Sequence, residues 1–201
     1  VFPLSWKGET PDDSFVGFRE FGFDPRAVLN FLAFLGWNPG TEQELFSLEE
    51  LIKAFNVEKI GKAGARFDFD KAKWFNQQHL MHLPDAELAQ MVRPLVEAKG
   101  FSPTDAFLQA FCGMMKERVV LLTDFWDNGY YFFTDVQEYD QKIIVKKWTP
   151  TSADVFGELL TGLKELPAFT APAIQESVET IIARKELKFG DVLPILRIGL
   201  K

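Results

Sequence analysis

The sequence predicts a mainly α-helical protein, and three of its features carry that prediction. Apolar residues recur every three or four positions along most of the 201 residues, which is the spacing of one buried helix face. Helix start and stop signals flank many of these runs. The chain shows neither strand–helix–strand alternation nor a series of strands, so we expect at most one or two short strands, within the first 70 residues.

The first helix is predicted after a loop-like stretch over residues 1–23. Asp24 occupies the N-cap position, Pro25 suits the first helical turn, and Gly36 is typical of a helix end. Apolar side chains occupy nearly every side of the intervening residues. We therefore expect this helix to be buried.

A second helix is predicted to begin at a capping box. In this motif the Ser47 hydroxyl accepts from the Glu50 amide, while the Glu50 carboxylate accepts from the Ser47 amide. Further along, Phe67 and Phe69 alternate with acidic residues, which favours a short extended segment. An aspartate then caps a helix that continues to about Leu80.

A domain boundary is predicted near Leu83 and Pro84, where a helical bundle begins. One amphipathic helix starts at Pro84 and stops at Gly100, and the next starts at Pro103. Further helices are expected at 120–133, 136–147, 152–164, 172–185 and 190–199.

Composition excludes several classes of protein. With 47% hydrophobic and 25% charged residues the chain can build a core, which excludes a disordered protein. No run of about 18 apolar residues is present, so we expect no membrane span. The single cysteine, Cys112, suits a reducing compartment, and we expect a cytoplasmic protein. The chain opens at Val1 without an initiator methionine, and we interpret it as a piece of a longer protein.

The chain is acidic overall but contains two basic islands. A net charge of −7 argues against nonspecific binding of nucleic acids, and we expect no DNA partner. However, residues 53–73 and residues 180–201 each carry a local charge of +3. These islands could hold a structured polyanion at defined points, or they could be ordinary solvated helix faces.

A glycine loop lies inside the first basic island, at residues 61–65. It lacks the Gly-Lys-Ser/Thr ending of a nucleotide-binding P-loop. Its backbone amides and Lys62 could instead meet RNA phosphates. In the sequence Lys146-Lys147-Trp148, a core tryptophan beside solvated lysines explains the residues better than a ring offered to RNA.

The chain offers no complete catalytic or metal site. His79 and His82 lack the further ligands that zinc needs. Cys112 sits in an apolar stretch without a nearby histidine base, which favours a small core residue. Asp68 and Asp70 resemble an acid–base pair, but helix capping explains them better. We therefore predict no catalytic residue and no metal ligand here.

Four stretches together resemble one known family, the bacterial glutamyl-tRNA synthetases. These stretches are Gly22–Asn38, Glu44–Leu51, Phe67–Asn76 and Lys188–Arg197, and their order and spacing agree over nearly the whole chain. The family's class I enzymes activate glutamate with ATP and magnesium and attach it to glutamate tRNA. Its HIGH-type and KMSKS-type motifs, which belong to a Rossmann catalytic domain, are absent from this sequence.

The resemblance implies a small α/β-like unit that contacts the tRNA stem, over residues 1–83, followed by a helical anticodon-binding region over residues 84–201. The second helical subdomain ends early relative to the family pattern. The resemblance thus implies a C-terminal portion of the ligase that positions tRNA(Glu) and does no chemistry, partnered by the catalytic domain of the same chain. No cofactor is expected in this portion, and ATP would bind in the parent enzyme.

The resemblance also carries site residues over, one at a time. Arg118, Lys188 and Arg197 match anticodon-contacting positions of the family, while an arginine of the family falls near Glu179 here. The other interpretation of Arg118 is a surface arginine paired with Glu117 or Asp124.

From the first basic island we expect contacts to the tRNA backbone by Lys53, Lys62 and Arg66. The rival function is a helical protein–protein interaction module without an RNA role, which the acidic first 50 residues favour.

Overall fold

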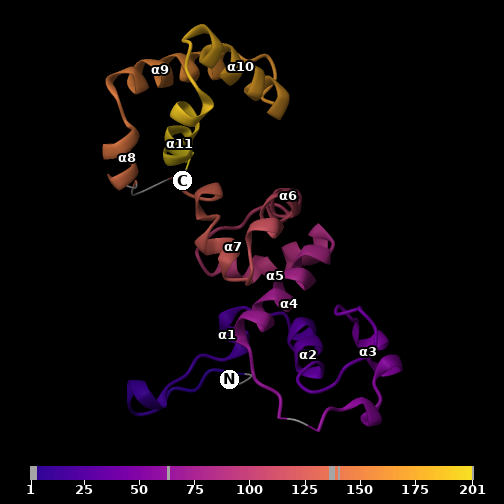
Figure 1. Ribbon diagram of the computed structural model, residues 1–201. Coiled ribbons are helices and arrows are strands. Elements are labelled where there is room, and N and C mark those ends of the chain that lie inside the picture. The colour runs from indigo at the N-terminus through magenta and orange to yellow at the C-terminus, as the bar shows by residue number, and fades with distance from the viewer. Residues whose placement is uncertain (1–3, 63, 136–138, 140, 201) are drawn as a thin grey trace. The chain divides into compact units, whose positions relative to one another are not determined.

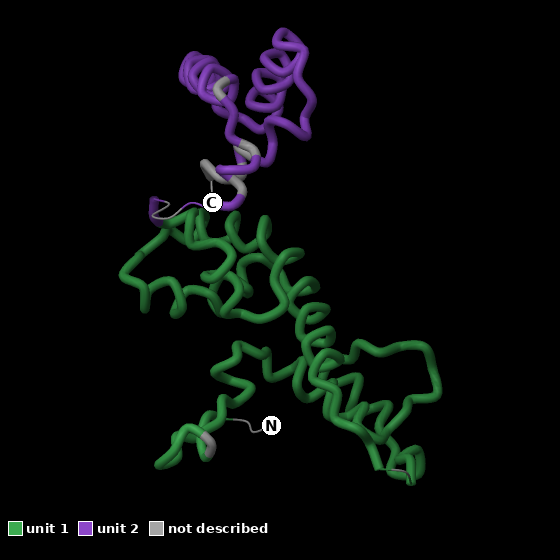
Figure 2. Tube along the Cα trace, turned by 60° about the vertical axis from the view of Figure 1, so that its left-hand side comes forward, with its two compact units in different colours: residues 1–133 green, residues 134–201 purple. Residues whose placement is uncertain are grey.

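The computed structural model describes residues 4–62, 64–135, 139 and 141–200. The chain forms two compact units, residues 1–133 and residues 134–201, which are coloured separately in Figure 2. Helices dominate both units, which confirms the predicted mainly α class (Figure 1).

The first unit contains eleven helical elements in its described part. Up to residue 82 these are the 3₁₀ turns η1 and η2 and four α-helices: η1 Pro11–Asp13, α1 Phe18–Phe21, α2 Pro25–Ala33, α3 Leu48–Ala54, η2 Val57–Lys59 and α4 Phe69–His82. They are followed by α5 Asp85–Glu97, α6 Asp105–Met115, η3 Lys116–Arg118, α7 Asp124–Asp127 and η4 Tyr130–Phe132. The helix expected over 120–133 is thus only the short α7 and η4.

The prediction of one or two short strands is wrong, because the part of the chain that the structure describes contains no strand. Only two isolated antiparallel bridges occur there, Trp6 with Phe15 and Trp37 with Ile60. The alternation of Phe67 and Phe69 has another cause, because Phe69 is the first residue of α4 and both rings pack against neighbouring phenylalanines.

The predicted helix caps are confirmed. The Asp24 carboxylate accepts a hydrogen bond from the Arg26 amide at 2.9 Å. In the capping box, the Glu50 amide donates to Ser47 Oγ at 3.2 Å and the Ser47 amide donates to the Glu50 carboxylate at 2.7 Å. Asp68 caps α4, which also confirms the structural interpretation of that carboxylate.

A phenylalanine-rich core joins α2 to α4. Phe31 and Phe75 are both buried, and their ring centroids lie 6.1 Å apart. The expectation that α2 is buried holds for only part of its surface: Ala27 and Phe31 are buried, but Leu29 and Leu32 are 42% and 47% exposed. The side of α2 that packs on α4 carries Phe31, which shares a core with Phe75.

A second core of the first unit lies between α5 and α6. The buried residues of this core are Leu80, Leu88, Ala89, Val92, Val96, Leu108, Phe111, Cys112, Met115, Val119 and Phe125. Leu80 comes from α4, so one helix contributes Phe75 to the first core and Leu80 to the second. Figure 1 shows α4 between α2 and α5 accordingly.

The second unit consists of α8 Gln141–Lys147, α9 Pro150–Lys164, α10 Ala171–Arg184 and α11 Phe189–Leu200. Its small core is formed by Val155, Leu159, Ile181, Ile182 and Val192. The predicted helices of this region are confirmed, although residues 136–138 and 140 of the first of them lie outside the described residues. Among the described helices of both units, none is long and apolar enough to span a bilayer.

Candidate nucleic-acid interface

Three cations of the first basic island are exposed and form no salt bridge with the described residues. Lys53 lies on α3, whereas Lys62 and Arg66 lie in the segment between η2 and α4. Within the residues that the structure describes, none of the three forms a salt bridge. The charges of Lys62 and Arg66 are therefore available to an external anion. The charge of Lys53 also acts on Glu50, whose pKa is lowered mainly by hydrogen bonds from Ser47 and additionally by Lys53.

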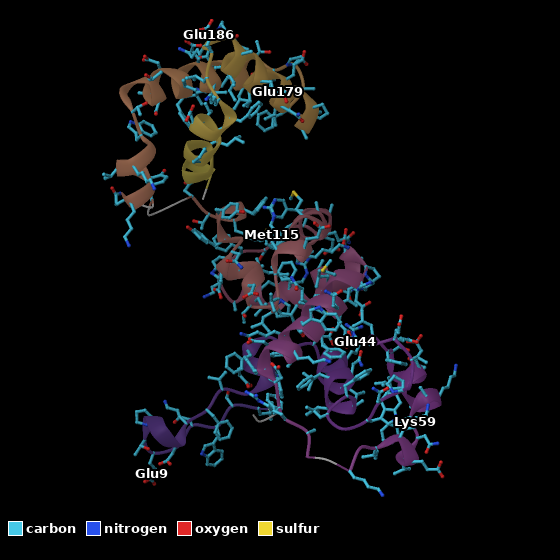
Figure 3. All side chains as sticks on the ribbon, in the orientation of Figure 1. Glu9, Glu44, Lys59, Met115, Glu179 and Glu186 are labelled. Atoms are coloured by element: carbon cyan, nitrogen blue, oxygen red, sulfur yellow. The ribbon has the colours of Figure 1, made fainter. Side chains whose placement is uncertain are left out.

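The other three cations of this island are used internally. Lys71 pairs with Glu44 at 3.3 Å, and Lys73 pairs with Asp70 at 3.5 Å. Lys59 donates to the carbonyl of Pro39 at 2.6 Å, and Figure 3 labels both Lys59 and Glu44. Six basic residues that look alike in the sequence thus fall into two groups of three.

The loop that leads to Lys62 is fixed against the buried indole of Trp37. Trp37 is 3% exposed and bridges to Ile60. Next to that bridge, the Gly61 amide donates to the Gly36 carbonyl at 2.6 Å. These bonds fix the backbone directly before Lys62. The Lys62 side chain is therefore attached to an ordered segment.

Arg118 ends the 3₁₀ turn that follows α6. Met115 and Val119 on either side of it are buried, and Figure 3 labels Met115 at the end of α6. The Arg118 side chain is exposed, and in the described part of the chain it forms an ion pair with neither Glu117 nor Asp124. The alternative of a paired surface arginine is therefore not met here.

The Asp124 carboxylate has other partners. It accepts from the backbone amides of Val120 at 2.8 Å and Leu121 at 2.9 Å. A buried amide, Asn76, holds the same segment from the other side, since its Nδ2 donates to the Val120 carbonyl at 2.5 Å. Sequence reasoning missed Asn76, because its polar partners lie 44 and 52 residues away.

In the second unit, Lys188 is exposed and directly precedes α11. Its carbonyl accepts from the Asp191 amide at 2.9 Å. Arg197 belongs to α11, but its side chain lies outside the described residues. Glu179, where the family has an arginine, is exposed on α10 and accepts from the Gln175 side chain at 2.8 Å.

A pocket of about 350 Å³ opens in the second unit near Lys188. Its lining includes Lys146, Phe156, Leu187 and Asp191. Trp148 is 47% exposed, with its ring centroid 5.7 Å from that of Phe156. The expectation of a core tryptophan is therefore wrong, because the ring covers the neighbouring aromatic side chain and leaves much of itself in solvent.

A larger groove of about 1110 Å³ runs between α9 and α10, and its charge does not suit RNA. Asp154, Glu158, Glu165 and Glu176 line it, whereas its two cations come from the end of α10. Phosphate groups would meet mostly like charge in this groove.

The candidate reactive side chains have structural roles. Cys112 is fully buried, and burial raises the pKa of its thiol to about 12, so it remains protonated and unreactive. His79 Nε2 donates to Asn30 Oδ1 at 3.1 Å, and His82 Nδ1 donates to the Gln78 carbonyl at 2.6 Å. Across the described residues, no group of three or more His, Cys, Asp or Glu side chains is arranged to hold a metal ion.

An apolar groove of about 340 Å³ lies between α2 and α3. This α2/α3 groove is lined by Leu29, Ala33, Leu48, Leu51, Ile52 and Phe55. Ile52 is 70% exposed, so this side chain has little contact with the rest of the unit.

Comparisons with known proteins agree on one family. A family model described as an anticodon binding domain matches residues 87–201. The glutamate–tRNA ligase of Christiangramia forsetii is 44% identical over 201 residues, and that of Flavobacterium johnsoniae is 42% identical over 200 residues. Both alignments cover 100% of this chain but only 40% and 39% of the relatives.

Solved structures give the same result. A glutamate tRNA ligase from Elizabethkingia meningosepticum, in complex with its amino acid, superposes with a TM-score of 0.89 at 34% identity. The glutamate-tRNA synthetase of Elizabethkingia anophelis gives a TM-score of 0.81 at 33% identity. The chain is covered completely in both cases and spans 40% and 39% of those structures.

Proposed function

Because the chain belongs to the family of anticodon binding domains found in glutamate–tRNA ligases, we propose that it holds glutamate tRNA for such a ligase. In this role it positions the RNA, while activation of glutamate with ATP and magnesium takes place in the rest of the enzyme. The observation that carries the proposal is the set of exposed cations that form no salt bridge in the described part of the chain, at Lys53, Lys62, Arg66 and Arg118.

The two kinds of cation suit two kinds of contact. Lysines act as point charges for phosphate oxygens, so Lys53 and Lys62, together with Arg66, would fix the register of the tRNA backbone. Arg118 offers a planar fork of donors, which fits the edge of an unstacked anticodon base. Lys188 and Arg197 would provide further contacts from the second unit.

A proximity effect explains how such a chain serves a reaction that it does not perform. When backbone and anticodon contacts fix the tRNA, the acceptor end reaches a distant active site in a defined orientation. Within this scheme, residues 1–83 would contact the stem and residues 84–201 the anticodon. The reduced Cys112 thiol is consistent with a cytoplasmic setting.

The rest of the ligase polypeptide is the proposed protein partner. The chain spans about two-fifths of the relatives it matches, so three-fifths of their length lies outside it. The α2/α3 groove is apolar, and the neighbouring Glu49 and Glu50 are exposed, which disfavours RNA there. We assign this groove to an apolar segment of the catalytic part.

The test of the proposed function is a binding titration with glutamate tRNA, the same tRNA carrying a substituted anticodon, and duplex DNA. The chain should prefer glutamate tRNA over both competitors. Arg118→Ala should remove about 1–3 kcal/mol of the anticodon preference, because the lost fork contacts a base. Equal affinity for all three nucleic acids would contradict the proposal, and an equal loss for both tRNAs would make Arg118 a phosphate contact.

A further inference from the structure

We propose that Asn76 is a positioning residue for Arg118: its buried amide ties α4 to the segment after Arg118 and thereby sets where the guanidinium stands. This inference rests on the proposed function, because it assumes that Arg118 reads an anticodon base. Asn76 itself is 0% exposed and cannot touch RNA.

Both ends of the Asn76 amide are used. Its Oδ1 accepts from the Asp24 amide at 2.7 Å, and its Nδ2 donates to the Val120 carbonyl at 2.5 Å. One side chain on α4 therefore connects the start of α2 to a residue two positions after Arg118. A buried amide with both groups satisfied has a single orientation, since rotating it would leave two polar groups unpaired.

The backbone after Arg118 is held on two sides. Asn76 binds the carbonyl of Val120, while the Asp124 carboxylate binds its amide at 2.8 Å. Val119, which lies between Arg118 and Val120 in the sequence, is fully buried. The peptide groups that follow Arg118 thus have little freedom, which limits the positions that the exposed guanidinium can reach.

The turn between α1 and α2 adds a second attachment. The Leu122 amide donates to the Gly22 carbonyl at 2.9 Å, and Thr123 Oγ1 donates to the Phe21 carbonyl at 3.2 Å. Gly22 has a φ of +86°, and a Cβ there would lie 2.9 Å from the Thr123 amide nitrogen. Only glycine allows this approach, so the turn and the segment meet backbone to backbone.

Charge anchors the other side of the junction. The Asp24 carboxylate is buried and binds Arg26 at 2.7 Å, and Arg26 binds Glu87 on α5 at 2.6 Å. These two carboxylates raise the pKa of Arg26. The Asn76 site is therefore the point where α2, α4 and the segment after Arg118 are joined, with α5 attached through Arg26.

Asn30 provides a matched control. It is also 0% exposed, and its amide donates to the Glu44 carbonyl at 3.0 Å and accepts from the Phe46 amide at 2.9 Å. The remaining partner is His79 at 3.1 Å. All of these partners precede residue 80, so losing Asn30 damages the core without releasing the segment after Arg118.

The experiment measures anticodon discrimination, which is the ratio of affinities for glutamate tRNA and for the same tRNA with a substituted anticodon, using the complete chain. Asn76→Ala should lower this ratio about 2- to 30-fold. In the Arg118→Ala background it should cause no further fall in the ratio, because both changes act on one contact. Asn30→Ala should leave the ratio within about twofold of the unsubstituted chain.

Thr123→Val provides a milder second variant, needed if circular dichroism shows that Asn76→Ala does not fold. It removes only the bond to the Phe21 carbonyl and should lower the ratio in the same direction. If Arg118→Ala loses discrimination but Asn76→Ala leaves the ratio unchanged, the positioning role alone is overturned. Where Asn76→Ala does not fold, an unchanged ratio in Thr123→Val has the same meaning. Equal losses from Asn30→Ala and Asn76→Ala also overturn it. An unchanged ratio in Arg118→Ala overturns this inference through its premise, because Arg118 would then not read a base. The proposed function itself is overturned only if the unsubstituted chain binds glutamate tRNA, the substituted tRNA and duplex DNA equally well.

Discussion

Under the proposed function, individual side chains and not the net charge determine where the first unit contacts RNA. Lys62 and Lys71 belong to one basic island in the sequence, yet only Lys71 has a carboxylate partner, Glu44. A local sequence pattern cannot reveal this difference, because Glu44 lies 27 residues before Lys71.

The salt dependence of tRNA binding should distinguish these two lysines. Lys62→Ala should reduce the slope of log affinity against log salt by about one, because one phosphate contact disappears. Lys71→Ala should change the slope less, since its ammonium group is already paired with Glu44. Filter-binding titrations at several salt concentrations measure both slopes, and equal reductions would show that the pairing has no effect on RNA binding.

A single histidine should make stability depend on pH. Burial lowers the pKa of His79, an effect that the nearby charge of Arg26 supports and that of Asp24 opposes. Since the unfolded chain binds a proton that the folded chain rejects, the free energy of unfolding should fall as pH drops below about 6.5. His79→Gln should flatten this dependence in urea titrations. A dependence that survives His79→Gln would assign the titration to another group.

At the scale of elements, helix starts could be predicted from the sequence and the environment of each face could not. The caps at Asp24, Ser47 and Asp68 involve partners within three residues, so their geometry follows from local order. Which side of α2 is buried depends on which helix packs against it, and the local sequence does not contain that information. Leu29 and Leu32 are apolar and are therefore expected in the core, but both are about half-exposed.

The α2/α3 groove gives the element-scale prediction. Ile52→Glu should weaken association of this chain with a separately produced catalytic part of the ligase by about tenfold or more, because a charge would be buried in an apolar contact. Because the Ile52 side chain is 70% exposed, the isolated chain should keep its fold and its thermal midpoint in this variant. Val57→Glu, at a 72% exposed position outside the groove lining, is the control. Unchanged association would assign the groove to another occupant, and dimers of the chain that Ile52→Glu dissociates would identify a second copy.

For the molecule as a whole, the sequence was sufficient for the class, the helix order and the family. It could not predict long-range pairs such as Asn76 with Val120, which depend on how α4 packs on distant segments. The net charge of −7 is also a poor guide to binding, since exposed charges separated by more than about 8–10 Å are largely screened at physiological salt. Cations that form no salt bridge with the described residues, such as Lys62 and Arg118, can therefore serve the proposed contacts to phosphates and bases on an acidic protein.

Hydroxyl-radical footprinting of glutamate tRNA bound to the complete chain tests whether the chain holds the RNA as proposed. We expect protection of the anticodon loop and of the inner corner of the tRNA, where residues 53–73 would meet its backbone, with the acceptor end left open. Protection should weaken at the anticodon loop in Arg118→Ala and at the inner corner in Lys62→Ala. Protection confined to the acceptor end, or the same footprint on an unrelated tRNA, would contradict this expectation.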